Sequence, residues 1–183
     1  ERQALGEDSK DHPATFSPTM VADFIGFFTK QGQTVLDPFV GIGSTLVACD
    51  RTKRKGIGIE LSKKYAGMAC KRTKQQVIID DARNISKMGL PKIDYCITSP
   101  PYWSILNRST GSFKKDRTAK GLSTNYSNKK TDLGNIESYE EYLETMFDIY
   151  KQIYDLLKPG GYITVIVKNI KQNGSFYPLA WDL

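Results

Sequence analysis

The chain has 183 residues, of which 39% are hydrophobic and 25% charged, and its formal net charge is +6. This composition is typical of one soluble globular domain with a single sizeable core. No stretch approaches the ~18 apolar residues that a membrane-spanning helix needs, so the sequence excludes a membrane-spanning protein of that kind. The basic charge is compatible with a polyanionic partner but does not require one.

The ends and the cysteines of the chain indicate its context. The N-terminus has neither an initiator methionine nor a signal-peptide pattern, so we expect part of a larger cytoplasmic polypeptide. Cys49, Cys70 and Cys96 are scattered and odd in number, and they lie in apolar surroundings. They predict neither a disulfide framework nor a metal site, and we expect reduced thiols in the core.

A first helix is predicted from residue 18 to about residue 30. Ser17 followed by Pro18 is a helix start signal. The apolar residues that follow recur at helical spacing and should form its buried face: Met20, Val21, Phe24, Phe27 and Phe28. The only histidine, His12, precedes this helix, and we interpret it as a surface or capping residue rather than a catalytic one.

A strand, a glycine-rich turn and a helix follow, over residues 34–36, 37–43 and from residue 44 onward. Gly41 and Gly43 let the backbone turn sharply and approach a ligand closely, as cofactor loops of doubly wound sheets require. The residue three beyond Gly43 is Leu46, so the match to a dinucleotide-binding GxGxxG motif is incomplete. This pattern favours a cofactor turn without a pyrophosphate cradle.

A second strand is predicted over residues 56–60, and Ser62 then starts a helix that runs to about residue 73. Glu60 ends this strand 17 residues after Gly43, close to the offset of an acid that accepts hydrogen bonds from ribose hydroxyls. The alternative is that Glu60 caps the following helix. A third strand, residues 77–79, ends in Asp80, Asp81 and Ala82, where an acid can accept from an adenine amine or cap a short helical turn.

The fourth strand, residues 93–98, leads into Ser99, Pro100, Pro101, Tyr102 and Trp103. Proline fixes its own φ and restrains the residue before it, so this corner should be extended, with carbonyls in fixed directions. Fixed acceptors beside an aromatic ring suit a planar ligand that carries an amino group. The alternative is a proline-rich turn with Tyr102 and Trp103 as rim packing. Polar residues thus follow all four strands at the edge where open α/β sheets bind ligands.

Residues 104–138 are predicted to form a long basic loop, with seven basic and three acidic residues and a net charge of +4. Such a loop suits a mobile lid or a contact to a phosphate backbone, and a solvated insertion is an equal alternative. Ser138 then starts a helix whose tyrosines we interpret as core residues. Residues 158–161 are predicted to end this helix. Residues 162–167 are predicted to form a strand that is buried on both faces, and Pro178 is a possible start of another helix. The alternation of strands and helices predicts an α/β fold with a doubly wound, mostly parallel sheet.

The glycine turn at residues 37–43 and the motif at residues 98–102 together resemble the paired signature of the DNA amino-methyltransferases, the cytosine-N4 and adenine-N6 enzymes that use S-adenosylmethionine. Residues 12–16 are similar to the segment that precedes the glycine turn in this family, and the similarity spans residues 12 to about 182. The resemblance implies a Rossmann-like methyltransferase fold, DNA as partner, and a possible restriction-modification partner. The oligomeric state is not indicated.

The resemblance also assigns roles to residues. It implies catalytic residues in the target-base pocket, namely Ser99, Pro100, Pro101 and Tyr102. It implies cofactor contacts from Phe16, Asp37, Phe39, Gly41, Gly43, Glu60, Asp81 and Ala82, with Asp37 near the methionine ammonium and no metal ion.

Two departures from the family pattern lead to a further expectation. Two more strands, as an antiparallel hairpin, normally follow the fifth strand, and a separate target-recognition region is normally present; neither is expected to fit within residues 168–183. Residues 1–183 are therefore predicted to be a partial catalytic domain. Serine before the two prolines favours N4 of cytosine as target. The alternatives are N6 of adenine, an RNA-modifying enzyme of similar fold, and a catalytically inactive nucleic-acid-binding module.

Overall fold

The computed structural model of the chain describes residues 17–103, 132–172 and 174–183. His12, Phe16 and most of the predicted basic loop lie outside these ranges. No helix within them is long and apolar enough to cross a membrane.

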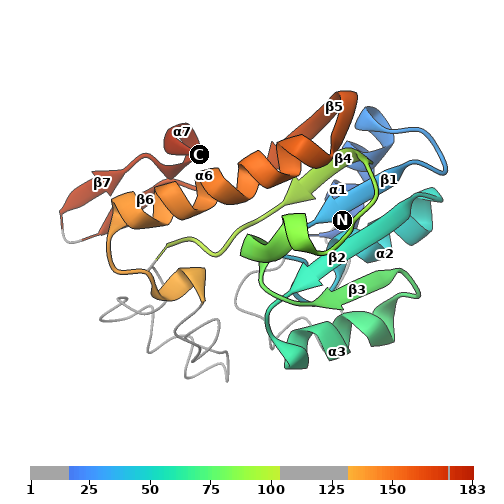
Figure 1. The fold of residues 1–183 in the computed structure, drawn as a ribbon, viewed down its shortest axis with the longest axis horizontal. Coiled ribbons are helices and arrows are strands. Elements are labelled where there is room, and N and C mark those ends of the chain that lie inside the picture. The colour runs from blue at the N-terminus through green and yellow to red at the C-terminus, as the bar shows by residue number, and fades with distance from the viewer. Residues whose placement is uncertain (1–16, 104–131, 173) are drawn as a thin grey trace.

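A five-stranded parallel sheet forms the centre of the described structure (Figure 1). Its strands lie in the order β3-β2-β1-β4-β5, and each neighbouring pair is parallel. They comprise β1 (Thr34–Asp37), β2 (Lys55–Glu60), β3 (Gln76–Ile79), β4 (Ile93–Thr98) and β5 (Leu157–Val165). The chain runs outward from β1 to β3 and then returns to place β4 on the other side of β1. This reversal confirms the predicted doubly wound α/β fold.

The predicted start signals begin three of the helices. The hydroxyl oxygens of Ser17, Ser62 and Ser138 accept hydrogen bonds from backbone N–H groups in the first turns of α1 (Pro18–Phe28), α3 (Lys63–Arg72) and α6 (Tyr139–Leu156). The other helices are α2 (Ser44–Thr52), the 3₁₀ helices η2 (Ala82–Lys87) and η3 (Leu133–Asn135), and α7 (Leu179–Asp182). Helix α7 begins directly after Pro178, as predicted.

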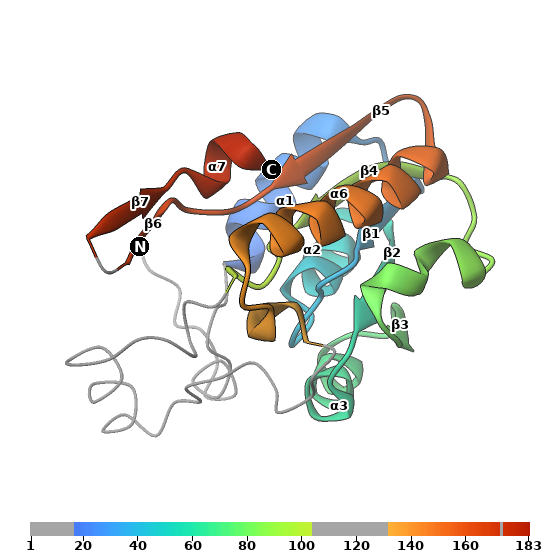
Figure 2. The same ribbon diagram turned by 60° about the vertical axis from the view of Figure 1, so that its left-hand side comes forward.

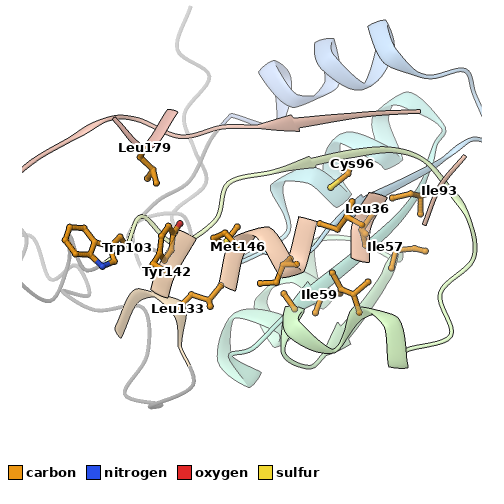
Figure 3. Packing of buried hydrophobic residues seen from close by; sticks show 14 of the residues in the cluster. Leu36, Ile57, Ile59, Ile93, Cys96, Trp103, Leu133, Tyr142, Met146 and Leu179 are labelled. Atoms are coloured by element: carbon orange, nitrogen blue, oxygen red, sulfur yellow. The ribbon is translucent and has the colours of Figure 1, made fainter. Parts of the chain in front are cut away.

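Helices cover both faces of the sheet (Figure 2), and two hydrophobic clusters hold most of them there. In β1, Val35 joins the cluster with α1 and α2, whereas its neighbour Leu36 joins the cluster with η2 and α6. In β4, Tyr95 and Cys96 divide in the same way, because successive side chains of a strand point to opposite faces. Figure 3 shows Leu36 and Cys96 on the side that carries Met146 of α6.

The buried faces of α1 and α6 differ in part from the sequence prediction. In α1 the fully buried residues are Val21 and Ile25, whereas Phe27 is 83% exposed. In α6 the buried residues are Tyr142, Met146, Ile149 and Ile153, so the interpretation of its tyrosines as core is right for Tyr142 and wrong for Tyr154, which is exposed. The spacing of apolar residues indicates which side of a helix is apolar, but the element packed against that side decides how many of those residues are buried.

The prediction that the fifth strand is buried on both faces is wrong. Strand β5 is the edge of the sheet, it begins earlier than expected at Leu157, and its residues are exposed or half-buried, including Tyr162 and Ile163. A continuous apolar run does not specify whether a strand lies at the centre or the edge. Cys70 is likewise exposed on α3, whereas Cys49 and Cys96 are buried as predicted.

A hairpin does form in the last residues, contrary to expectation. Strands β6 (Ile170–Gln172) and β7 (Ser175–Tyr177) pair antiparallel, but only with each other, and they do not extend the five-stranded sheet. Figure 1 shows them at the far end from β3, next to α7 and the start of α6. Their strands are short enough to fit within the segment for which no hairpin was expected.

Candidate active site

The carboxyl ends of β1, β2, β3 and β4 surround one pocket, with a cavity of about 80 Å³ that is partly open to solvent. Of the predicted site residues, seven line this pocket: Phe39, Gly41, Glu60, Asp81, Ala82, Ser99 and Pro101. Asp37, Gly43, Pro100 and Tyr102 are not among its lining residues, and Phe16 lies outside the described ranges.

The two glycines of the turn after β1 serve different purposes. Both have positive φ, +54° for Gly41 and +88° for Gly43, which residues with a side chain rarely adopt. The Gly41 N–H points to β2 and donates to Glu60 Oε2 at 2.9 Å, so this glycine joins the turn to the pocket. Gly43 precedes α2, and a Cβ there would lie 3.0 Å from Cβ of Ala69. Close packing of α2 against α3 therefore explains Gly43.

Asp37 ends β1 and lies buried beneath the pocket. Its carboxylate accepts hydrogen bonds from the hydroxyls of Thr45 and Thr98 at 2.5 and 2.6 Å, and from the backbone N–H of Phe39 at 3.1 Å. Burial raises the pKa of Asp37 to about 6, although these three hydrogen bonds lower it in part. Asp37 thus joins the glycine turn, α2 and β4 at the base of the site.

Glu60 lies at the tip of β2 with its carboxylate in the pocket wall. Its two oxygens accept from the backbone N–H groups of Gly41 and Ser62, at 2.9 and 2.7 Å. Each carboxylate oxygen has two lone pairs, so further hydroxyl donors can be accepted. Burial raises the pKa of Glu60 to about 7, against these hydrogen bonds and with contributions from the charges of Asp132 and Asp37. The cap of α3 is the Ser62 hydroxyl rather than Glu60.

The acids after β3 are already engaged by protein donors. Asp81 accepts from its neighbour Arg83 through the backbone N–H, Nε and Nη2, at 3.0, 3.0 and 2.5 Å, and it caps η2. Asp80 accepts from the Asp81 N–H and the Asn84 amide, and these bonds hold its pKa below the usual value. The predicted cap after β3 is therefore present. A ligand amine at Asp81 would share its oxygens with the guanidinium.

The corner after β4 is held by α6. The carbonyl oxygen of Pro101 accepts from the Tyr142 hydroxyl at 2.7 Å and from the Trp103 N–H at 2.9 Å. No described residue donates a hydrogen bond to the Pro100 carbonyl oxygen. Ser99 Oγ lies 3.2 Å from the Tyr102 hydroxyl, and the Lys168 ammonium lies 5.9 Å from the centre of the Tyr102 ring.

Trp103 anchors this corner in the core, so its interpretation as rim packing is wrong. Its side chain is only 3% exposed, its φ is +34°, and its ring lies 5.1 Å from the ring of Tyr139 and 4.8 Å from that of Tyr177. Figure 3 shows Trp103 beside Tyr142, away from the sheet. Tyr102 is half-buried next to it.

Several lining residues were not singled out from the sequence as ligand contacts. They are Pro38, Ile59, Leu61, Ser62, Tyr65, Asp132 and Leu133. Most adjoin a predicted site residue and follow from the strand ends. Asp132 and Leu133 had no such signal, because they come from a distant segment with no periodicity. The tertiary structure places the start of η3 beside the carboxyl ends of the strands, where it lines the pocket.

Among the residues that the structure describes, the lining contains four acidic side chains and apolar walls, and none of these lining residues is a lysine or arginine. Such a wall is unsuited to a pyrophosphate, which needs positive groups. Carboxylate acceptors beside Phe39, Ile59 and Leu133 suit the hydroxyls and the flat ring of a nucleoside without phosphate groups. The residues present therefore fit S-adenosylmethionine better than a dinucleotide.

Comparisons with known proteins identify the family of the chain. The family described as DNA methylase, N6 and N4 type, matches residues 1–71 and 93–180. The orphan methyltransferase M.BamHII of Bacillus amyloliquefaciens is 31% identical over 93 residues, which are 51% of this chain and 35% of that protein. The type II methyltransferase M.Cfr9I of Citrobacter freundii is 41% identical over 61 residues, 33% of this chain and 20% of that protein. The chain thus matches about a third or less of these relatives.

Solved structures share the fold at low identity. One from Clostridium thermocellum, described as a putative rRNA methylase, has a TM-score of 0.57 at 19% identity, and the match covers 88% of this chain and 76% of that chain. The glycopeptide N-methyltransferase MtfA, complexed with sinefungin, has a TM-score of 0.50 at 13% identity, with 84% and 50% covered.

Proposed function

We propose that this chain, which belongs to the DNA methylase family, carries the cofactor pocket and the target-amine corner of a DNA methyltransferase with N4 of cytosine as target. S-adenosylmethionine is the methyl donor. The observation that carries the proposal is the pocket itself: the residues after β1, β2 and β3 that the motif assigns to the cofactor share one cavity with Ser99 and Pro101 of the motif after β4. A methyl donor and an acceptor amine must meet at such a junction.

In this proposal the residues of the pocket have separate tasks. Glu60 accepts from the ribose hydroxyls, while Phe39, Ile59 and Leu133 exclude water from the adenine ring. Gly41 fixes the position of Glu60 through its N–H, and Asp37 fixes the turn from below. The cofactor, when bound, supplies an electrophilic methyl group on a positively charged sulfur.

The corner after β4 holds the acceptor. An exocyclic base amine has its lone pair delocalised into the ring, so acceptors for its two hydrogens favour the pyramidal nitrogen that can attack. The Pro100 carbonyl, to which no described residue donates, and the Ser99 hydroxyl supply two such acceptors. The new N–C bond forms as the methyl–sulfur bond breaks, and the amine then loses one proton to solvent. Tyr102 stacks on a base that has been flipped out of the duplex.

The tyrosine of α6 keeps this corner in place. Since the Tyr142 hydroxyl and the Trp103 N–H both occupy the Pro101 carbonyl, that oxygen is a structural acceptor, and the neighbouring Pro100 carbonyl is left for the amine. The division explains why two prolines are useful here. In this proposal the Pro101 carbonyl positions the corner and the Pro100 carbonyl accepts from the amine.

The test is methyl transfer by the full-length protein. DNA of mixed sequence is incubated with isotopically labelled S-adenosylmethionine, digested to nucleosides and analysed by mass spectrometry. Labelled N4-methylcytosine is the expected product. Labelled N6-methyladenine would replace the cytosine assignment but keep the family and pocket. A parallel incubation with RNA in place of DNA tests the alternative of an RNA-modifying enzyme. The absence of any product together with absence of cofactor binding would favour an inactive nucleic-acid-binding module.

A further inference from the structure

We infer that Asp132 is a further cofactor-binding residue, whose negative charge makes the pocket prefer the cationic methyl donor to its product of zero net charge. The inference rests on the proposed function, since it concerns the same pocket. Asp132 belongs to no motif of the sequence. It enters the site only through tertiary structure, from a segment that lies more than thirty residues beyond the end of β4.

The position of Asp132 is fixed from both sides. Its side chain lines the pocket but is only 5% exposed, and its Oδ1 accepts from the Gly134 N–H at 2.9 Å, which caps η3. Leu133 is equally buried and belongs to the main core cluster, where Figure 3 shows it close to Tyr142. The cap and the anchor together hold the carboxylate at the pocket wall. Within the described structure no donor reaches its Oδ2.

Of the four acids, Asp132 accepts the fewest hydrogen bonds within the described structure, although the charge of the Arg83 guanidinium also acts on it. Asp81 has the Arg83 guanidinium, Asp80 has a backbone N–H and the Asn84 amide, and Glu60 has two backbone N–H groups. Asp132 has a single backbone N–H. Its charge already acts on the interior of the pocket, because it adds to the burial that raises the pKa of Glu60. A cation in this cavity would therefore be attracted by the Asp132 carboxylate.

The chemistry of the two cofactor states supplies the selectivity. S-adenosylmethionine carries a sulfonium and an ammonium against one carboxylate, so its net charge is +1. S-adenosylhomocysteine has a neutral thioether and no net charge. A carboxylate in a partly buried wall favours the first and is indifferent to the second. Loss of the methyl group thus weakens the hold of the pocket on the product, which assists its release.

The test compares Asp132→Asn with the wild type in calorimetric titrations of S-adenosylmethionine, S-adenosylhomocysteine and sinefungin, whose amine replaces the sulfonium with another cation. Asparagine keeps the acceptor for the Gly134 N–H and is an equally good cap, so only the charge changes. Asp23→Asn, on an exposed position of α1, is the matched control. Thermal unfolding checks that all variants are folded.

The affinity of Asp132→Asn for the two cationic ligands should fall by about tenfold, the factor that corresponds to one partly screened charge interaction. Its affinity for S-adenosylhomocysteine should change by less than about twofold. Equal losses for all three ligands, or no loss for any, would overturn the inference and leave the proposed function intact. A wild-type protein that binds none of the three would instead refute the proposed function.

Discussion

Replacement of Glu60 by glutamine tests the cofactor pocket most directly. The substitution keeps the shape of the side chain but removes a carboxylate that lies between two backbone donors, Gly41 N–H and Ser62 N–H. In the wild type the pKa of this carboxyl is about 7, chiefly because it is buried. The charged form is the better acceptor for ribose hydroxyls, so cofactor affinity should rise as the pH rises through 7.

The size of the effect follows from the ionised fraction. With a pKa near 7, about 9% of the wild type carries the carboxylate at pH 6 and about 91% at pH 8, so the apparent affinity should increase roughly tenfold. At pH 8 the lost charge-assisted hydrogen bonds correspond to about 1.5–3 kcal/mol, so Glu60→Gln should bind about 10- to 150-fold more weakly. The variant should lack the pH dependence that belongs to Glu60.

The assay is calorimetric titration of S-adenosylmethionine at several pH values between 6 and 8. The groups of the cofactor itself titrate identically in both proteins, so the difference between the two pH profiles isolates Glu60. Glu144→Gln, on an exposed position of α6, is the matched control. Parallel profiles for the wild type and a folded Glu60→Gln variant would refute the reasoning, as would equal affinities at pH 8.

Four further predictions follow from the same contacts. Burial raises the pKa of Asp37 from 3.8 to about 6, so its contribution to the free energy of unfolding is complete below pH 4 and is lost as the pH rises through 6. In urea unfolding at several pH values, Asp37→Asn should lack about 3 kcal/mol of this loss. Parallel plots of unfolding free energy against pH for the wild type and the variant would contradict the prediction. Gly43→Ala should destabilise by about 1–3 kcal/mol through positive φ and the contact with Ala69, while the folded fraction keeps its cofactor affinity. Ser99→Ala in the full-length enzyme should lower kcat more than cofactor affinity, and the reverse result would move Ser99 into the cofactor site. Tyr142→Phe should cost about 1 kcal/mol of stability by loss of the bond to Pro101, measured by denaturant unfolding against the exposed control Tyr154→Phe.

The sequence determined the order and type of the elements in residues 17–103 and of α6, whereas η3 and the β6–β7 hairpin were not predicted. Each of the three serine start signals caps a helix, and the four strands before residue 104 lie where their apolar runs predicted. These signals are local, since a cap or a strand period depends on a few neighbouring residues. The rule that ligands bind at the carboxyl ends of parallel strands then located the pocket without any distance information.

The tertiary structure decided which polar atoms remain available and which faces are covered. Asp37 and Asp81 look equivalent to Glu60 in the sequence, because each follows a strand. In the structure Asp37 accepts from hydroxyls, Asp81 accepts from a guanidinium, and Glu60 accepts from backbone N–H groups only. Asp132 has no local signal at all, because its role depends on a contact between segments far apart in the chain. The position of β5 also depends on contacts between distant segments. Its apolar run led to the prediction of a buried strand, but its place at the edge is decided by which strands pair with it.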